Sequence, residues 1–430
     1  MTKFQDFEEL EKALEKIEVP KEALRERKQL ALTQIQRERK KKRRTIQSVV
    51  LVATLMLVFV TSIRVSPAFA QAIAKIPGFA PLVEMIAYDK GMIDILEFEY
   101  YEELGISETK NNLTLTLVGA VADGSGMVLS YKLEAPYDIS KLETKKLELM
   151  HNDEGIMGAL MYSWPVKEPT KIIEDKIIVT SKEGLDYSNK EFQLDIGFDD
   201  PAETTFSIPF TLRKPIAETK IYELNKEVSL EGQKLMIERL LISPLRAELK
   251  IELPESNSMQ ILSLENNIKL LDEHNEEWGR ITNGVIGFGS LRDGEYSYFM
   301  QSNYFREPKK LTLVLEDVTA LQKGQDYIEV DFNKKEVISK PAMITPLIEV
   351  KESEVVLTTY TKNANVAASF HHLIDATGKE FYGDGQWYHE IEGGIEAGYS
   401  FDTSQIQNPV KLYFDNYPNF LKGKIEIQVK

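Results

Sequence analysis

The stretch LTLTLVGAVADGSGMVLSYKLEA, residues 113–135, decides the fold of the larger part of this chain. Apolar and polar residues alternate with a period of two on both sides of Asp123-Gly124-Ser125-Gly126, a run that is typical of tight turns. The stretch therefore predicts a β-hairpin. Further short apolar runs follow it, namely KLELM, KIIVTS, FQLDIGF and TTFSIPFTL, and together they predict a β-sandwich.

The same pattern of short apolar runs occurs again after a charged connector. Lys214-Pro215 and the stretch AETKIYELNKE, residues 217–227, precede the runs KLMIERLLI, AELKIEL, IKLLDE and KLTLVLEDV. We therefore expect a mainly β body of tandem immunoglobulin-like β-sandwich units. Their expected bounds are 106–215, 216–338 and 339–430.

An internal repeat supports this division of the last two hundred residues. Leu270-Leu271-Asp272 followed by Glu277-Trp278-Gly279 resembles Leu373-Ile374-Asp375 followed by Phe381-Tyr382-Gly383, at an offset of about 103 residues. Pro308 and Leu311 likewise match Pro409 and Leu412, at an offset of 101. Because the two offsets nearly agree, one β unit of roughly 100 residues is predicted to occur twice.

Before the β body lies an apolar segment, TIQSVVLVATLMLVFVTSI, residues 45–63. Its 19 residues carry no charge, and as a helix they would measure ~28 Å, enough to cross the hydrocarbon core of a bilayer. Seven Lys and Arg residues lie between positions 37 and 44, whereas only Arg64 and Lys75 lie in the 20 residues after the segment. This excess predicts one transmembrane helix in the cell membrane, with the N-terminus cytoplasmic and the β body extracellular.

A secretory signal peptide is the competing interpretation of this segment. Ala68-Phe69-Ala70 matches the small-x-small pattern of cleavage sites, but the 44-residue leader and the 19-residue apolar run are longer than in an ordinary signal peptide. An uncleaved anchor is therefore favoured, with Ala68 and Ala70 as candidates for regulated cleavage. Residues 64–105 predict a juxtamembrane collar of short helices, since Pro77-Gly78 and Pro81 interrupt them.

The cytoplasmic segment, residues 1–44, predicts two amphipathic helices that are separated at Val19-Pro20. Apolar residues at spacings of three and four form one stripe on the first helix: Phe4, Phe7, Leu10, Leu14 and Ile17. So short a segment cannot bury the stripe in a core of its own, so we expect a helical protein partner or the membrane surface to cover it. The alternative is a solvated helix that anchors only through its charge.

Charge divides the chain in the same way. The net charge is −16, but residues 1–44 carry 14 Lys+Arg against 9 Asp+Glu, which leaves 38 against 59 for residues 45–430. The acidic body argues against direct nucleic-acid binding, because the phosphate backbone selects basic surfaces. The chain contains no cysteine, which excludes disulfides, thiolate nucleophiles and zinc sites built on sulfur.

No motif in the sequence predicts catalysis, a cofactor or a metal site. The five histidines show no i, i+4 pair of the zinc-protease kind: His151, His274, His371, His372 and His389. Acidic pairs such as Asp199-Asp200 could in principle serve a glycosidase, which uses two carboxylates. Such pairs are expected by chance among 68 carboxylates. Four aromatic residues could line a glycan groove, although sandwich cores use the same residue types: Trp164, Trp278, Trp387 and Tyr388. We therefore expect no enzyme.

The order of these features resembles a known family. The features are the head with Ile17-Glu18-Val19-Pro20, the basic run, the apolar segment, Ser66-Pro67-Ala68-Phe69-Ala70, Ile76-Pro77-Gly78 and the β body with Asp123-Gly124. This order is similar to that of membrane-anchored, anti-sigma-factor-like regulatory proteins of Gram-positive bacteria, most clearly over residues 15–215. The resemblance implies that the head holds an extracytoplasmic-function sigma factor and that the β body senses the envelope through an unidentified extracellular ligand.

One departure from the family concerns the head. It lacks the Cys or His cluster of zinc-binding anti-sigma factors, so sequestration would be purely helical. The rival interpretation is a surface-anchored adhesion or cell-wall-binding protein without a signalling role.

Overall fold

The computed structural model describes residues 89–430, apart from 153, 157, 162–167, 265–267, 282–284 and 361–366. All of these residues belong to one compact unit of the chain, which begins at Ile73. The expected cytoplasmic segment, membrane segment and most of the collar lie outside the described residues. Within the described part, no helix combines the length and the hydropathy that a membrane crossing requires.

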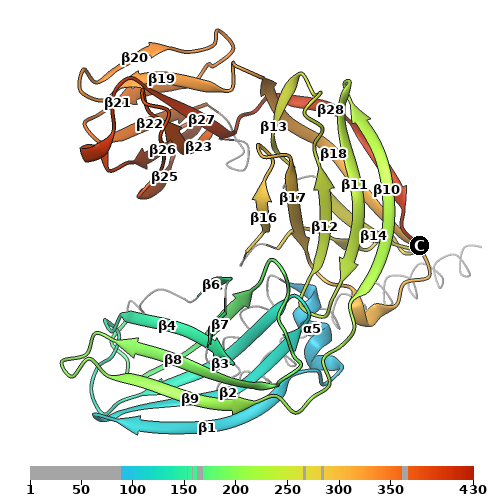
Figure 1. Cartoon of the computed structure of the whole chain (residues 1–430), viewed down its shortest axis with the longest axis vertical. Coiled ribbons are helices and arrows are strands. Elements are labelled where there is room, and N and C mark those ends of the chain that lie inside the picture. The colour runs from blue at the N-terminus through green and yellow to red at the C-terminus, as the bar shows by residue number, and fades with distance from the viewer. Residues whose placement is uncertain are drawn as a thin grey trace, which may run out of the picture. The chain divides into compact units, whose positions relative to one another are not determined.

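The described residues are mainly β, as the sequence predicts, with one α-helix, α5 (Lys90–Glu97). They form six sheets (Figure 1). Each of the three large hydrophobic clusters takes most of its residues from two of these sheets. We call the three pairs of sheets the first, second and third sandwich.

The first sandwich consists of a sheet in the order β1-β2-β3-β7-β6 and a sheet in the order β5-β4-β8-β9. The bounds of its strands are β1 (Glu102–Lys110), β2 (Leu113–Asp123), β3 (Gly126–Glu134), β4 (Thr144–His151), β5 (Glu154–Gly155), β6 (Ala159–Met161), β7 (Ile172–Thr180), β8 (Glu191–Phe198) and β9 (Thr205–Thr211). The predicted hairpin is confirmed, because β2 pairs with β3 in antiparallel register up to Asp123↔Gly126.

Strand β2 shows how the alternating pattern builds this core. Leu113, Leu115 and Leu117 are fully buried in the core of the sandwich. The register with β3 then shifts between Leu117 and Gly119, and beyond this bulge Ala120 takes the inward position. Val121 consequently faces the opposite side of the sheet, where it contacts the cluster around α5. Both faces of the hairpin tip are therefore buried.

The second sandwich consists of a sheet in the order β10-β11-β12-β17-β16 and a sheet in the order β13-β18-β14-β15, in which β28 also pairs with β18. The bounds are β10 (Lys220–Leu230), β11 (Gln233–Ile242), β12 (Ala247–Glu252), β13 (Met259–Ser263), β14 (Ile268–Asp272), β15 (Glu277–Trp278), β16 (Gly287–Ser290), β17 (Glu295–Met300), β18 (Leu311–Gln322) and β28 (Phe420–Gln428). A short 3-10 helix, η1 (Tyr304–Arg306), precedes β18.

The third sandwich consists of a sheet in the order β20-β19-β27-β23-β24 and a sheet in the order β21-β22-β26-β25. The bounds are β19 (Tyr327–Asp331), β20 (Glu336–Ser339), β21 (Leu347–Val350), β22 (Glu354–Thr359), β23 (Ser369–Ile374), β24 (Glu380–Tyr382), β25 (Gly385–Ile391), β26 (Gly394–Ser400) and β27 (Val410–Asn416). A 3-10 helix, η3 (Thr403–Gln405), lies between β26 and β27.

Strand β28 completes the second sandwich although it follows every strand of the third. It pairs with β18 from Thr312↔Gln428 to Thr319↔Phe420. The third sandwich is therefore inserted between two paired strands of the second, which differs from the tandem arrangement that we expected. The alternation in FLKGKIEIQ predicts a strand but not its partner, because tertiary packing selects a pairing over so long a separation.

The internal repeat is confirmed by strand pairing. In the second sandwich β14 pairs with β15 and β18, and in the third β23 pairs with β24 and β27 in the same order. Asp272 and Asp375 occupy equivalent places. Each carboxylate accepts a backbone N–H four residues later, from Glu276 at 2.8 Å and from Lys379 at 3.1 Å.

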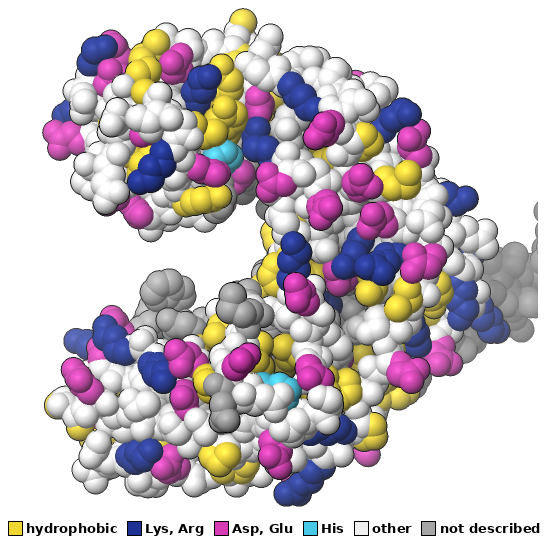
Figure 2. Space-filling model, in the orientation of Figure 1, with side chains coloured by type: hydrophobic (Ala, Val, Ile, Leu, Met, Phe, Trp, Pro, Cys, Tyr) yellow, Lys and Arg dark blue, Asp and Glu magenta, His cyan; other side chains and the backbone are white. Residues whose placement is uncertain are grey.

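Charged side chains of both signs are interspersed over the face of the described residues that Figure 2 shows. Hydrophobic side chains form small groups on the same face.

Candidate functional site

Helix α5 is the first described element after the expected membrane segment, and it is enclosed by two sandwiches. Met92 and Ile95 are 1% and 0% exposed. They share a hydrophobic cluster with residues of the first sandwich and with one of the second: Val121, Val128, Ile178 and Leu245. We call α5, this cluster and the polar residues that hold it the joint; these polar residues are Asp89, Asp94, Tyr100, Glu102, Asp123, Arg246 and Arg306.

The N-terminal end of α5 lies against the backbone of the second sandwich. Asp89 caps the helix by accepting the Gly91 N–H at 2.8 Å. A Cβ atom at position 91 would lie 3.0 Å from the Ser302 carbonyl oxygen and 3.2 Å from the Ser302 nitrogen. Glycine therefore permits a close approach that a larger residue would obstruct.

A forked ion pair ties the middle of α5 to η1. The Arg306 guanidinium donates through Nε to Asp94 Oδ2 at 2.9 Å and through Nη2 to Asp94 Oδ1. Nη2 also donates to Glu97 Oε2 at 3.3 Å. Asp94 is 1% exposed, so this two-pronged geometry balances a buried carboxylate with an arginine of the second sandwich.

Asp123 joins the hairpin tip of the first sandwich to the second. Its Oδ1 accepts the N–H and the hydroxyl of Ser125, both at 2.7 Å, which fixes the turn. Its Oδ2 accepts the Leu245 N–H at 2.6 Å. Burial raises the pKa of Asp123, while the Leu245 and Ser125 donors and the charge of Arg246 act against that rise.

Arg246, next to Leu245, reaches from the second sandwich into the first. Its Nη1 donates to Thr180 Oγ1 at 2.9 Å, and its guanidinium lies 4.9 Å from the centre of the Phe299 ring. Asp123 and Asp89 supply negative charge around it. A buried cation thus lies in the field of carboxylates from the hairpin and from the cap of α5.

The residues that follow α5 hold the connector between the sandwiches. The Tyr100 hydroxyl donates to the Ala122 carbonyl at 2.8 Å and accepts the Ala217 N–H at 2.9 Å. Burial raises the pKa of Tyr100 to about 12, so it remains a donor at neutral pH. The Glu102 carboxylate accepts the N–H groups of Arg213 and Lys214 at 2.8 Å and 3.0 Å.

Asp89 gives the joint a group that titrates in mildly acidic solution. Burial raises the pKa of Asp89 to about 6, and the Gly91 N–H and the charge of Arg246 oppose this rise. Asp94 adds a smaller repulsion that raises the pKa further. Among the described residues, no group of three His, Asp or Glu side chains could hold a metal ion. The joint holds α5 between the two sandwiches.

The predicted partner-binding residues lie outside the described residues: Phe4, Phe7, Leu10, Leu14 and Ile17. The same holds for Ala68 and Ala70, the candidates for cleavage, and for Trp164. These assignments stay predictions.

The acidic pair and the histidines serve structural contacts where the structure describes them. Asp199 accepts the Glu143 N–H at 2.7 Å and so ties the chain after β8 to the chain before β4. Asp200 accepts the Thr204 N–H at 2.6 Å and so fixes the turn before β9. His151 bonds the Asn189 carbonyl at 2.9 Å, and His372 stacks on Tyr413 with ring centres 5.2 Å apart.

The other predicted aromatic residues divide between core and surface. Trp278 is 2% exposed in the second core. Trp387 lies across Gly398, where a Cβ atom would be 2.2 Å from the indole ring. Tyr388 is 53% exposed, and it borders a cavity between the second and third sandwiches.

The polar residues of the joint were not predicted as a site. The sequence marks Asp123 as a turn residue, because Gly124 follows it. A role in the turn explains this aspartate, so the sequence does not predict its bond to the second sandwich. Arg246 and Arg306 carry no local signal, since a buried arginine looks like a surface arginine in sequence. Their partners lie 66 and 212 residues away.

Comparisons with known proteins found two families of unknown function. A domain of unknown function (DUF4179) matches residues 40–135, and a family of unknown function (DUF5643) matches residues 219–351. No curated protein matches the chain. Among solved structures, the conserved domain protein from Bacillus anthracis is similar at a TM-score of 0.39 and 14% identity, over 77% of this chain and 92% of that one. A similarity of that size carries no argument about function.

Proposed function

We propose that this chain is a single-pass membrane regulator of the anti-sigma type. In this proposal the head, residues 1–44, sequesters a sigma factor in the cytoplasm, residues 45–63 cross the membrane, and immunoglobulin-like sandwiches outside the cell receive the signal. The charge asymmetry around the apolar segment supports this orientation. The match to one domain over residues 40–135 supports it too, because that match joins the basic run and the apolar segment to the first hairpin.

The observation that carries the proposal is the enclosure of α5. The helix begins 27 residues after the end of the expected membrane segment, and both flanking sandwiches hold it through the joint. A chain with one membrane span can couple outside to inside only by cleavage, assembly or displacement of that span. A helix clamped between two domains responds when either domain moves, and it would pass the movement to the span.

Cleavage near Ala68 and Ala70 is the readiest form of coupling under this proposal. Both residues lie between the expected span and α5. In this proposal, a protease reaches these two residues less readily while the joint holds α5. Release of α5 would lengthen the accessible chain around these small residues.

The experiment that tests the proposal is recovery of the cytoplasmic partner. We expect wild-type protein, purified from cells, to bring down a sigma factor, and the Leu10→Asp/Leu14→Asp variant to lose it. Truncating large anchors in an apolar face typically costs more than ~1 kcal/mol each, and placing a charge there costs more. The matched control is Glu11→Gln/Glu15→Gln, which alters the polar faces of the same helix.

Equal recovery of the same proteins by the wild type and the Leu10→Asp/Leu14→Asp variant would contradict the proposal. If both double variants fail to recover the sigma factor, the substitutions have disrupted the head as a whole, and the apolar stripe is not specifically responsible.

A further inference from the structure

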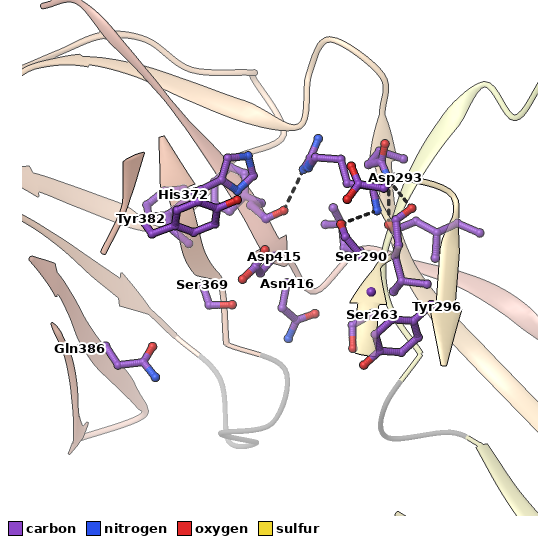
Figure 3. A pocket seen from close by; sticks show the side chains of 18 of the residues that line it. Ser263, Ser290, Asp293, Tyr296, Ser369, His372, Tyr382, Gln386, Asp415 and Asn416 are labelled. Atoms are coloured by element: carbon purple, nitrogen blue, oxygen red, sulfur yellow. Dashed lines mark hydrogen bonds between the residues drawn. The ribbon is translucent and has the colours of Figure 1, made fainter. Parts of the chain in front are cut away.

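A cavity of about 760 Å³ lies between the second and third sandwiches. None of the polar residues of the joint lines it. Figure 3 shows Gln386, Tyr382 and His372 on one side of the cavity, Ser263, Ser290 and Tyr296 on the other, and Asp415 and Asn416 between them. The walls therefore come from two different sandwiches.

Arginine 292 holds the two walls together. Arg292 Nη1 donates to Asp326 Oδ2, and Nη2 donates to the Phe414 carbonyl at 3.1 Å. The guanidinium also lies 4.7 Å from the centre of the Tyr413 ring. A second tie runs from β18, where Thr319 Oγ1 donates to Asn416 Oδ1 at 3.0 Å. The cavity is therefore formed in advance of any ligand.

Two tyrosines that line the cavity are exposed. Tyr382 is 57% exposed and Tyr388 is 53% exposed, whereas Tyr399 next to Tyr388 is 3% exposed. The Tyr388 hydroxyl donates to Gln386 Oε1 at 3.2 Å, which helps to fix this ring. Flat, exposed rings of this kind bind the C–H face of a sugar ring, since they combine an apolar face with a polar edge.

The remaining lining is polar and offers both donors and acceptors. It includes hydroxyl, amide and carboxylate groups from both walls: Ser263, Ser290, Ser369, Gln386, Asp415 and Asn416. Such side chains suit a ligand rich in hydroxyls, because each hydroxyl both donates and accepts hydrogen bonds. A purely apolar ligand would displace water from these polar groups.

The charges at the cavity disfavour an anionic ligand. Among the described residues that line it, the cations are Arg280 and Arg292, and Arg292 is engaged with Asp326. The carboxylates are Asp293, Glu380 and Asp415. A phosphate or a uronic acid would therefore meet more negative charge than available positive charge.

We propose that this cavity binds a short, neutral oligosaccharide. Its volume falls within the range of ~300–1,000 Å³ that is usual for small-molecule sites. The tyrosines take the faces of the sugar rings, and the polar side chains of both walls bind the hydroxyls. This site goes beyond the proposed function and does not depend on the sigma factor.

The test uses full-length protein in detergent micelles and calorimetric titration with defined probes. The neutral probes are di- and trisaccharides of glucose and of N-acetylglucosamine. The comparison probes are trigalacturonic acid, which is anionic, and trialanine, which is a peptide. We expect saturable binding of at least one neutral probe and about tenfold weaker binding to Tyr382→Ala and to Tyr388→Ala, as for the loss of one stacking contact.

Tyr360→Ala is the matched control, because Tyr360 belongs to the same sandwich, is 67% exposed and does not line the cavity. This variant should bind as the wild type does. The inference is overturned if no neutral probe binds, if the cavity variants bind as well as Tyr360→Ala, or if trialanine or trigalacturonic acid binds instead. None of these outcomes concerns the cytoplasmic partner, so failure here is distinct from failure of the proposed function.

Discussion

Asp89 makes the joint sensitive to protons. Its pKa of about 6 in the folded protein exceeds the value of 3.8 for a free aspartate. The folded state therefore binds this proton more tightly than the unfolded state does. Its contribution to stability is fully present below about pH 4 and is lost as the pH rises past 6.

Replacing Asp89 with Asn should remove this dependence, because Asn also caps helices well but does not ionise. We expect α5 in Asp89→Asn to be more stable than in the wild type by about 1–3 kcal/mol at pH 7, and equally stable near pH 4. Hydrogen exchange of the α5 amides at several pH values measures this difference. The control is Asp402→Asn at the cap of η3, which lies outside the joint. An unchanged pH profile in Asp89→Asn would contradict the assignment.

Residues with local roles were easier to predict than residues with distant partners. The strand that contains Leu113 and Leu117 was predicted, because alternation is a local pattern. Arg246 and Arg306 could not be predicted, since their roles depend on carboxylates that only the folded chain brings near. The pKa shift of Asp89 was likewise beyond the sequence, because it arises from burial.

At the scale of an element, α5 depends on its ion pair with Arg306. Arg306→Ala removes both donors from the buried Asp94 carboxylate. Breaking a fully buried pair costs about 3–5 kcal/mol. Arg306 is 46% exposed at its side chain, so solvent screens the pair and we expect a loss of about 1–2 kcal/mol in the local stability of α5.

The measurement for Arg306→Ala is hydrogen exchange of α5 together with a sigma-factor reporter in unstressed cells. The reporter should rise if the joint restrains the signal. Lys422→Ala serves as the control, because it removes an exposed pair with Asp317 that is worth about 0–1 kcal/mol. Faster exchange in α5 with no change in the reporter would show that the Arg306 ion pair stabilises α5 but does not restrain the signal.

Elements were predicted better than their connections. The hairpin at 113–135 and the equivalent hairpins of the repeat follow from short-range patterns of alternation and turn residues. The bulge in β2 and the pairing of β28 with β18 do not, because each depends on which surface packs against the strand.

At the scale of the whole molecule, the insertion predicts an unequal response to two deletions. Removing residues 420–430 takes away β28 and its buried Leu421 and Ile427, which together contribute about 3–6 kcal/mol. We expect the second sandwich to become susceptible to proteolysis. Replacing residues 324–417 with a two-residue turn removes far more chain, but the ends are already adjacent, since the Ala320 N–H donates to the Asn419 carbonyl at 3.0 Å.

Limited proteolysis and thermal unfolding compare the two deletion proteins. The large excision should leave the second sandwich resistant, apart from the loss of contacts that Leu262 and Leu321 make with the third core. If the short C-terminal deletion proves harmless while the large one unfolds the second sandwich, the pairing of β18 with β28 is not a structural requirement.

The return of β28 also sets the order in which the molecule can be completed during synthesis. The second sandwich lacks a strand until residues 420–428 have been made. At ~5–20 residues per second, the roughly 100 residues between β18 and β28 take about 5–20 s to appear. During that time one edge of β18 has no neighbour and is open to pairing with other chains. The inserted third sandwich has all its strands before its host does, so it can fold first and shorten the distance that β28 must travel.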